Sequence, residues 1–121
     1  PTLRMIVGGI GADQLSALPG IRVIGQRPEG IEVETPRYRE LTHLLARMAT
    51  EGASFVEIAG NDDILVTATS AQPDAAGAIF SFRRQGYGDW RHLIMVKVAD
   101  LGQLLRDMPQ HGLTLEHVHD Y

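Results

Sequence analysis

The end of the sequence carries two histidines separated by one residue, in the order His117-Val118-His119. If this segment is a strand, both imidazoles lie on one face, because side chains alternate between the faces of a sheet. Neutral imidazole is a common ligand of zinc and other transition metals. Two ligands do not complete such a site, and the further ligand would be His92 on a neighbouring strand or a residue of a neighbouring chain. The pattern therefore permits a weak metal site at His117 and His119 or the polar end of a strand, which we favour.

A glycine-rich segment, Gly8 to Gly11, follows an apolar run near the start of the sequence. Backbone N–H groups at a turn between a strand and a helix can hold an anion. The segment lacks the third glycine of a dinucleotide fingerprint and the Lys-Ser/Thr pair of a P-loop, which excludes both nucleotide motifs. An ordinary turn is the main interpretation, and a small anion site at Gly9 and Gly11 is the alternative.

Aromatic and arginine residues gather in a second turn segment, residues 86–91, which contains the only tryptophan of the chain. Aromatic side chains beside arginine are typical of interaction hot spots in protein interfaces. We predict either an interaction surface made by Tyr87, Trp90 and Arg91, or a Trp90 side chain that folds back onto its own sheet.

The sequence begins with a proline, an apolar strand, a glycine and Asp13-Gln14. Residues 1–15 in this respect resemble the tautomerase family, in which the amine of an N-terminal proline acts as the base. The resemblance implies Pro1 as the catalytic residue of a small isomerase-type enzyme. The chain has no cysteine and no Gly-x-Ser-x-Gly elbow, so covalent acyl transfer has no candidate nucleophile.

The elements that position these residues follow an internal repeat with a period of 60 positions. The first copy reads Glu40, Leu41, Leu44, Leu45, Met48, Gly52, Ser54, Phe55 and Ile58, and the second reads Asp100, Leu101, Leu104, Leu105, Met108, Gly112, Thr114, Leu115 and Val118. The period predicts two halves of one design, residues 1–60 and 61–121, which can together form one compact domain.

Each half is predicted to contain one long amphipathic helix followed by a strand. Thr35, followed by Pro36, is expected to cap the first helix, and Asp100 is expected to cap the second. Gly52 and Gly112 are expected to end them. The apolar positions at helical spacing should be buried, namely Leu41, Leu44 or Leu45, Met48, Leu101, Leu104 or Leu105, and Met108. Strands are expected at 3–7, 21–25, 31–35, 53–59, 64–69, 79–84, 92–98 and 113–119, with a short helix at 13–18.

This order of elements in the first half is β-α-β-β-α-β, the ferredoxin-like plan. In the second half, a loop containing Ser70, Pro73 and Gly77 stands where the first helix of that plan belongs. The fold prediction is therefore α+β: two ferredoxin-like halves with antiparallel sheets, the second half lacking its first helix. Helices cover one face of each sheet, and the bare face predicts a covering sister half, second chain or partner.

The second half also resembles a known family. The segment from Val96 to Val118 is similar to the strand-helix-strand core of ACT-type regulatory modules, which sense amino acids between paired ferredoxin-like units. The resemblance implies ligand binding at Asp100 and Gly102, in the turn between strand and helix. The first half, residues 18–52, looks like the small accessory domain that follows some transporter ATPases.

Composition narrows the function further. The chain has 121 residues, a net charge of -4 and no cysteine, which excludes disulfides and thiolate metal sites. No apolar run approaches the ~20 residues of a membrane span, and net acidity opposes nucleic-acid binding. We predict a cytoplasmic, non-catalytic regulatory or accessory subunit without a cofactor. It would bind a small anionic or amino-acid-like ligand and associate with itself, as a homodimer, or with a partner protein. The alternatives are the proline-dependent enzyme and the weak metal-binding protein.

Overall fold

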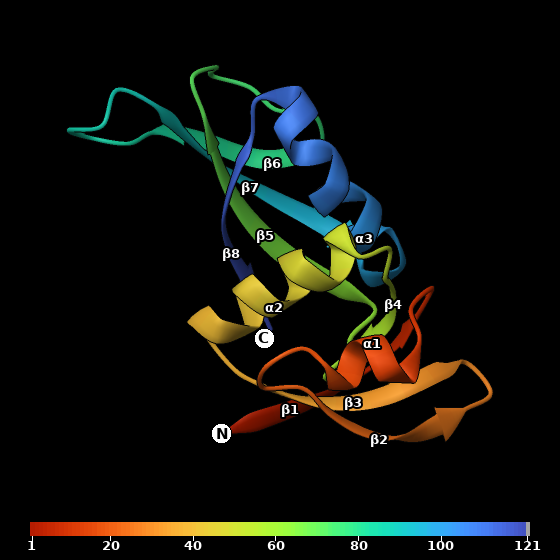
Figure 1. Ribbon diagram of the computed structural model, residues 1–121. Helices are drawn as coiled ribbons and strands as arrows, with labels where there is room; N and C mark the ends of the chain where they lie inside the picture. Colours follow the sequence, from red (N-terminus) through yellow and green to blue (C-terminus); the bar gives the residue numbers. More distant parts are fainter. Residues whose placement is uncertain (121) are drawn as a thin grey trace.

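The chain forms two four-stranded antiparallel sheets, and its two long helices lie where the sheets meet (Figure 1). The computed structural model describes residues 1–120. The first half comprises β1 (Thr2–Gly8), α1 (Ala12–Ser16), β2 (Arg22–Arg27), β3 (Gly30–Pro36), α2 (Arg39–Thr50) and β4 (Ser54–Ile58). The second half comprises β5 (Asp63–Ser70), β6 (Ala78–Arg83), β7 (Trp90–Lys97), α3 (Val98–Asp107), a 3₁₀ helix (Met108–His111) and β8 (Thr114–His119).

Both halves use the same strand order. The sheets read β2-β3-β1-β4 and β6-β7-β5-β8, and all neighbouring strands are antiparallel. Gly30 and Trp90 begin β3 and β7, and Ser54 and Thr114 begin β4 and β8, so these strands start 60 positions apart. Residues 71–77 of the second half cross between strands without a helix. The predicted α+β fold of two ferredoxin-like halves, the second without its first helix, is confirmed.

The hydrophobic core is built largely by the two long helices and the sheet faces that they cover. Leu41, Leu45, Met48 and Leu101 are fully buried and Met108 nearly so, as their helical spacing predicts. Residues from both halves belong to one continuous cluster of buried side chains. None of the helices in residues 1–120 has the length and apolar character that crossing a membrane requires.

The first residues of both long helices differ from the prediction. Thr35 and Pro36 are not a helix start: they extend β3, opposite Leu3 and Thr2 of β1. Strand pairing outweighs the local capping signal, and α2 begins three residues later, after Tyr38, which has a positive φ of 65°. In the second half, Val98 starts α3 directly after β7, which places the predicted cap, Asp100, inside the first turn. The predicted ends of the helices are confirmed, since Gly52 and Gly112 follow the two helical segments with φ 97° and 70°.

Each half places its long helix on the outer strand of the other half. Helix α2 packs on β8, where Oγ1 of Thr42 accepts a hydrogen bond of 3.0 Å from the Val118 amide. Helix α3 packs on β4, where Gly102 comes so close to the chain that a Cβ atom would lie 2.6 Å from the Ala53 carbonyl oxygen. Thr42 and Gly102 are 60 positions apart. Equivalent helix positions therefore meet the outer strand of the opposite half.

Two arginines add polar contacts between the halves. Nη1 of Arg106 in α3 donates to the carbonyl oxygens of Ala49 and Ala53, at 2.9 Å each. These carbonyls lie at and just beyond the C-terminal end of α2, where backbone acceptors lack helical partners. Nε of Arg37 donates to Oδ2 of the buried Asp120 at 2.9 Å. The halves are thus joined by hydrogen bonds as well as by the shared core.

Candidate functional site

The two C-terminal histidines lie together on one face of the second sheet. The ring centres of His117 and His119 are 4.5 Å apart in an edge-to-face arrangement, as strand alternation predicts. His92 does not join them, because its fully buried ring contacts Oγ of Ser70 at 2.8 Å and Oγ of Ser81 at 2.7 Å. Among residues 1–120, no group of three His, Cys, Asp or Glu side chains has the arrangement of a metal site.

A groove runs between α2 of the first half and β8 of the second. Its first part is a cavity of about 640 Å³ lined by Arg39, Thr42, His43, Ala46, Leu115, Glu116 and His117. Its second part is a cavity of about 540 Å³ lined by Ala46, Thr50, Leu105, Met108, Pro109, Gly112, Leu113, Thr114 and Leu115. The two parts share Ala46 and Leu115 and form one continuous surface, which we call the interhalf groove.

One end of the interhalf groove is polar and carries positive charge. Arg39 and His43 are exposed one helical turn apart on α2, which aligns them on one face. Across the groove, Glu116 receives a hydrogen bond from Nε of Arg91 at 2.7 Å, and a second from Nη2. The hydrogen bond from Arg91 lowers the pKa of the Glu116 carboxyl, although burial opposes this change. Because Arg91 balances the charge of Glu116, Arg39 dominates the potential at this end.

His117 is held in place at the polar end of the groove. Its Nδ1 lies 3.2 Å from Oγ1 of Thr42, the same hydroxyl that accepts the Val118 amide. Burial lowers the pKa of the neighbouring His119, and the charge of His117 lowers it further. His117 lines the groove. The lowered pKa of His119 favours the neutral form of its ring.

The other end of the groove is apolar. Leu105, Met108, Leu113 and Leu115 supply aliphatic walls, with Ala46 at the junction with the polar end. An apolar surface joined to a few convergent polar groups is the usual composition of a small-molecule site. The groove is thus suited to a molecule with a charged head and an apolar side.

The glycine-rich turn after β1 has a packing role. Gly9 has φ 72°, and a Cβ atom there would lie 2.7 Å from the carbonyl oxygen of Gly52. The amide of Gly11 donates to Oε1 of Gln14 at 3.0 Å, so this donor already has an acceptor. Glycine is required at position 9 by backbone approach, and the turn orders the short helix α1.

The turn at the start of α3 separates its two predicted ligand residues. Asp100 is exposed in the first turn, whereas Gly102 is buried against Ala53. The structure therefore does not bring their backbone or side-chain atoms to one open surface.

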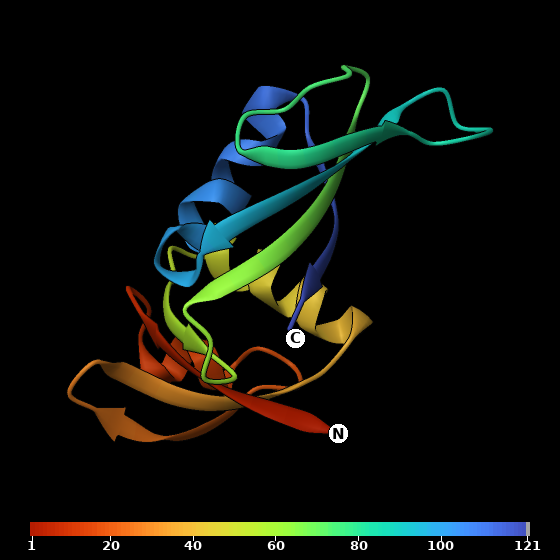
Figure 2. The ribbon, with the colours of Figure 1, turned by 180° about the vertical axis from the view of Figure 1, so that it is seen from behind.

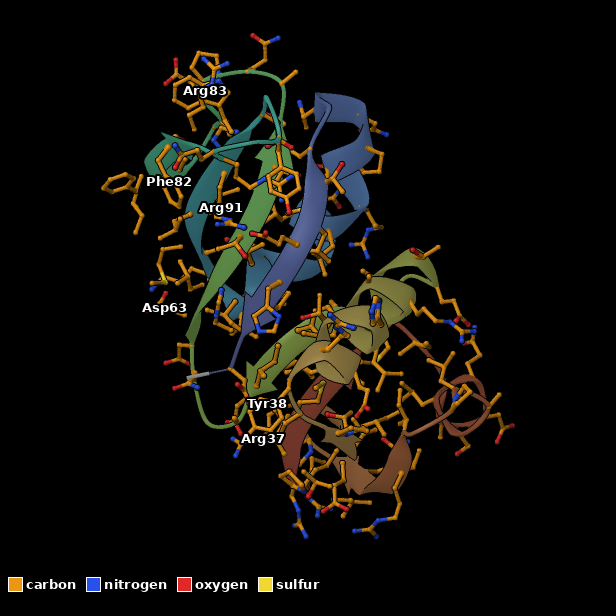
Figure 3. The ribbon with its side chains drawn as sticks, turned by 90° about the vertical axis from the view of Figure 1, so that its left-hand side faces the viewer. Arg37, Tyr38, Asp63, Phe82, Arg83 and Arg91 are labelled. Atoms are coloured by element: carbon orange, nitrogen blue, oxygen red, sulfur yellow. The ribbon has the colours of Figure 1, made fainter. Side chains whose placement is uncertain are left out.

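The turn before the tryptophan, residues 84–89, projects from the second sheet between β6 and β7 (Figure 2). Tyr87 is exposed at its tip, and the Arg84 guanidinium lies 4.0 Å from the centre of its ring. Trp90 and Arg91 are half-buried, and Arg91 lies on the open sheet face in its pair with Glu116 (Figure 3). The three predicted interaction residues thus divide into one exposed tip residue and two residues at the base of the hairpin.

A further cavity occupies the region of the second half where the first helix is missing. Its volume is about 300 Å³, and its lining comprises Ser70, Gln72, Asp74, Ala75, Ala76, Leu104, Asp107, His111 and Leu113. Ser70 contacts the buried His92 ring, which Ser81 contacts from the other side. Because serine hydroxyls of β5 and β6 contact both nitrogens of this buried ring, we assign His92 a structural role.

The N-terminal proline lies exposed before β1, whose first residue, Thr2, pairs with Pro36. None of the three cavities described above includes Pro1 in its lining. The candidate site is therefore the interhalf groove, whose lining does not include Pro1.

Comparison with protein family models, with curated proteins and with solved structures gives no match for this chain in any of the three. The sequence interpretation identified His117 but missed the α2 wall of the groove. Its signal is the spacing of Arg39, His43, Ala46 and Thr50, which recur on one face of a helix. The opposing wall comes from residues about 70 positions away, and only the fold brings it there.

Proposed function

We propose that this protein is a small-ligand-binding module with a regulatory or accessory role, and that the interhalf groove is its binding site. The observation that carries the proposal is the composition of the groove: a polar end with the cationic Arg39 beside His43 continues into an apolar wall at Ala46 and Leu115. The groove is open, and it takes one wall from each half of the chain.

The polar groups favour an apolar amino acid as the simplest ligand. Its carboxylate would accept charge-assisted hydrogen bonds from Arg39 and His43. Its ammonium group would donate to Glu116, since a carboxylate can accept more hydrogen bonds than those from Arg91. Its side chain would lie on Ala46 and Leu115. An anion without an ammonium group would contact Arg39 and His43 but would have no hydrogen bond to donate to Glu116.

A ligand in this groove would act as a regulator by holding the halves together. It would contact α2 and β8, which are joined directly by the hydrogen bond between Thr42 and Val118. A ligand that binds only this arrangement stabilises it in proportion to the ligand's occupancy. The same module would associate with itself or with a partner protein. That second chain would respond to the stabilised arrangement of the two halves.

A thermal-shift titration tests the proposal with L-leucine and L-phenylalanine as probes, and L-lysine and L-glutamate as comparisons. We expect the two apolar amino acids to raise the melting temperature saturably, because they bind the native state alone. Arg39→Gln should abolish the rise. Arg47→Gln is the matched control, since Arg47 lies exposed on the same helix and does not line the groove. No rise with either apolar amino acid, or an equal loss in both variants, would refute the groove as an amino-acid site.

A further inference from the structure

Three of the four outer strands of the two sheets are protected against pairing with another chain. Helix α3 packs on β4 and helix α2 packs on β8. The third, β2, carries arginines at both ends, and Arg22 and Arg27 form ion pairs with Glu34 and Glu32 at 3.1 and 2.6 Å. Covering elements and charged side chains are the usual means by which proteins prevent pairing at sheet edges.

The fourth outer strand, β6, is open and apolar. Within residues 1–120, it pairs with β7 on one side and with no strand on the other. Ile79, Phe80 and Phe82 are 67%, 59% and 38% exposed, and Met95 beside them on β7 is 48% exposed. The Phe80 and Phe82 rings are 5.7 Å apart, edge to face, and Phe82 is seen at the margin of the open sheet face (Figure 3). We call these four residues the β6 patch.

The size of the β6 patch fits a protein interface. With about 200 Å² for a fully exposed large side chain, the four residues present about 400 Å² on each chain. A typical stable interface buries about 800 Å² on each partner. The patch thus provides half of that area, and the backbone of β6 with its flanking loops is available for the rest.

Two charged residues beside β6 indicate what the partner is. Arg83 ends the strand, and Asp74 lies in the loop before it, where it lines a cavity with Ile79 and Phe80. Within the described part of the chain, neither Arg83 nor Asp74 forms an ion pair. A strand that pairs antiparallel with its own copy places each end of one chain beside the opposite end of the other. With Ser81 at the centre, Arg83 of one copy then lies opposite Ile79 of the second copy, and Asp74 of that copy lines a cavity with Ile79.

We propose that two copies of this chain associate through β6, antiparallel about a twofold axis near Ser81. Phe80 then faces Phe82 of the second chain, and Arg83 approaches Asp74 of the second chain. A twofold interface uses the same surface on both copies, and cross-strand aromatic pairs stabilise such a sheet. The result is one sheet that continues through both chains. This inference specifies the self-association within the proposed function, and it does not depend on the ligand.

Analytical ultracentrifugation of the full chain at micromolar concentration tests the proposal. We expect a dimer for the unmodified protein and a monomer for Phe80→Glu, because the substitution places a charge in the aromatic contact. Val56→Glu is the matched control, since Val56 is exposed to a similar degree (40%) on β4, and this variant should remain dimeric. A monomeric unmodified protein, or a dimer that survives Phe80→Glu, would overturn the assignment.

A charge exchange provides a second test that does not alter the apolar patch. Asp74→Arg and Arg83→Asp should each weaken the dimer about tenfold, because each brings like charges together. The double variant should restore the affinity, since the pair is re-formed with reversed signs. Failure of the double variant to recover would contradict the proposed register. Arg39→Gln should remain dimeric, so failure of the ligand proposal and failure of the dimer proposal are distinguishable.

Discussion

Thr42 and Val118 join the two halves of the chain: Oγ1 of Thr42 accepts a hydrogen bond of 3.0 Å from the Val118 amide. Both residues are buried. The bond satisfies an amide that an outer strand otherwise leaves open, and it fixes α2 beside β8. The wall of the interhalf groove depends on this contact.

Thr42→Val should therefore destabilise the protein by about 1–3 kcal/mol, because a buried amide is left without an acceptor while the side-chain shape is kept. Thr50→Val is the control, since the exposed Thr50 hydroxyl donates to the Ala46 carbonyl of its own helix. Urea unfolding monitored by circular dichroism measures both. An equal loss of unfolding free energy in the two variants would show that the contact between the halves contributes no more than a hydrogen bond within one helix.

Gly102→Ala should also destabilise the protein, although alanine favours helices by about 1 kcal/mol over glycine. The added methyl would lie 2.6 Å from the Ala53 carbonyl oxygen, so α3 must move away from β4. We expect a net loss of about 1–3 kcal/mol. Gln103→Ala, at the neighbouring exposed position, should change the free energy of unfolding by about 0.5 kcal/mol or less. Stabilisation by Gly102→Ala would contradict the close packing of α3 on β4.

Ser81→Ala should destabilise the core around His92. It removes the partner of Nδ1, 2.7 Å away, and leaves a polar ring atom buried without a hydrogen bond. We expect a loss of about 1–3 kcal/mol in chemical denaturation. Ser54→Ala is the control, because Ser54 is exposed on β4. An unchanged free energy of unfolding for Ser81→Ala would show that the contact contributes nothing.

The pKa of His119, lowered by burial and by His117, predicts how stability depends on pH. Below the ordinary imidazole value of about 6.5, the unfolded chain takes up a proton that the folded chain does not. Stability should therefore fall as the pH drops through this range. The lowered pKa of Glu116, with Arg91 as its cause, adds a loss only below the ordinary carboxyl range near ~4.5.

The variant that tests this pH dependence is His119→Gln, which should flatten the change in unfolding free energy between about pH 7 and 5. His43→Gln, at an exposed position on α2, serves as the control. Chemical denaturation at a series of pH values gives the slopes. A slope that His119→Gln leaves as steep as before would contradict the assignment.

Much of the fold follows from local sequence signals. The positions of Leu41 and Leu101 predict their burial, and Gly52 and Gly112 predict the helix ends, because each signal acts within a few residues. The predicted start of α2 was wrong because Thr35 and Pro36 pair with β1, a strand more than 30 positions away. Long-range pairing there decides between two locally acceptable structures.

The candidate site was less accessible from sequence. The sequence permits a metal site at His117 but favours the polar end of a strand, and the structure places this ring beside Thr42, a residue 75 positions away. The family resemblance implies a ligand contact at Gly102, whereas in the structure its close packing against Ala53 requires a glycine. Spacing along one segment identifies residues on one face, whereas the groove consists of faces from two halves.

Mapping the bound ligand by nuclear magnetic resonance tests the central claim most directly. In a titration of the uniformly ¹⁵N-labelled protein with L-leucine, the account predicts saturable shifts confined to amides of 39–46 and 113–117. These shifts should be lost in Arg39→Gln and retained in Arg47→Gln. The contradictory result is an absence of saturable shifts, or shifts that cluster away from both α2 and β8.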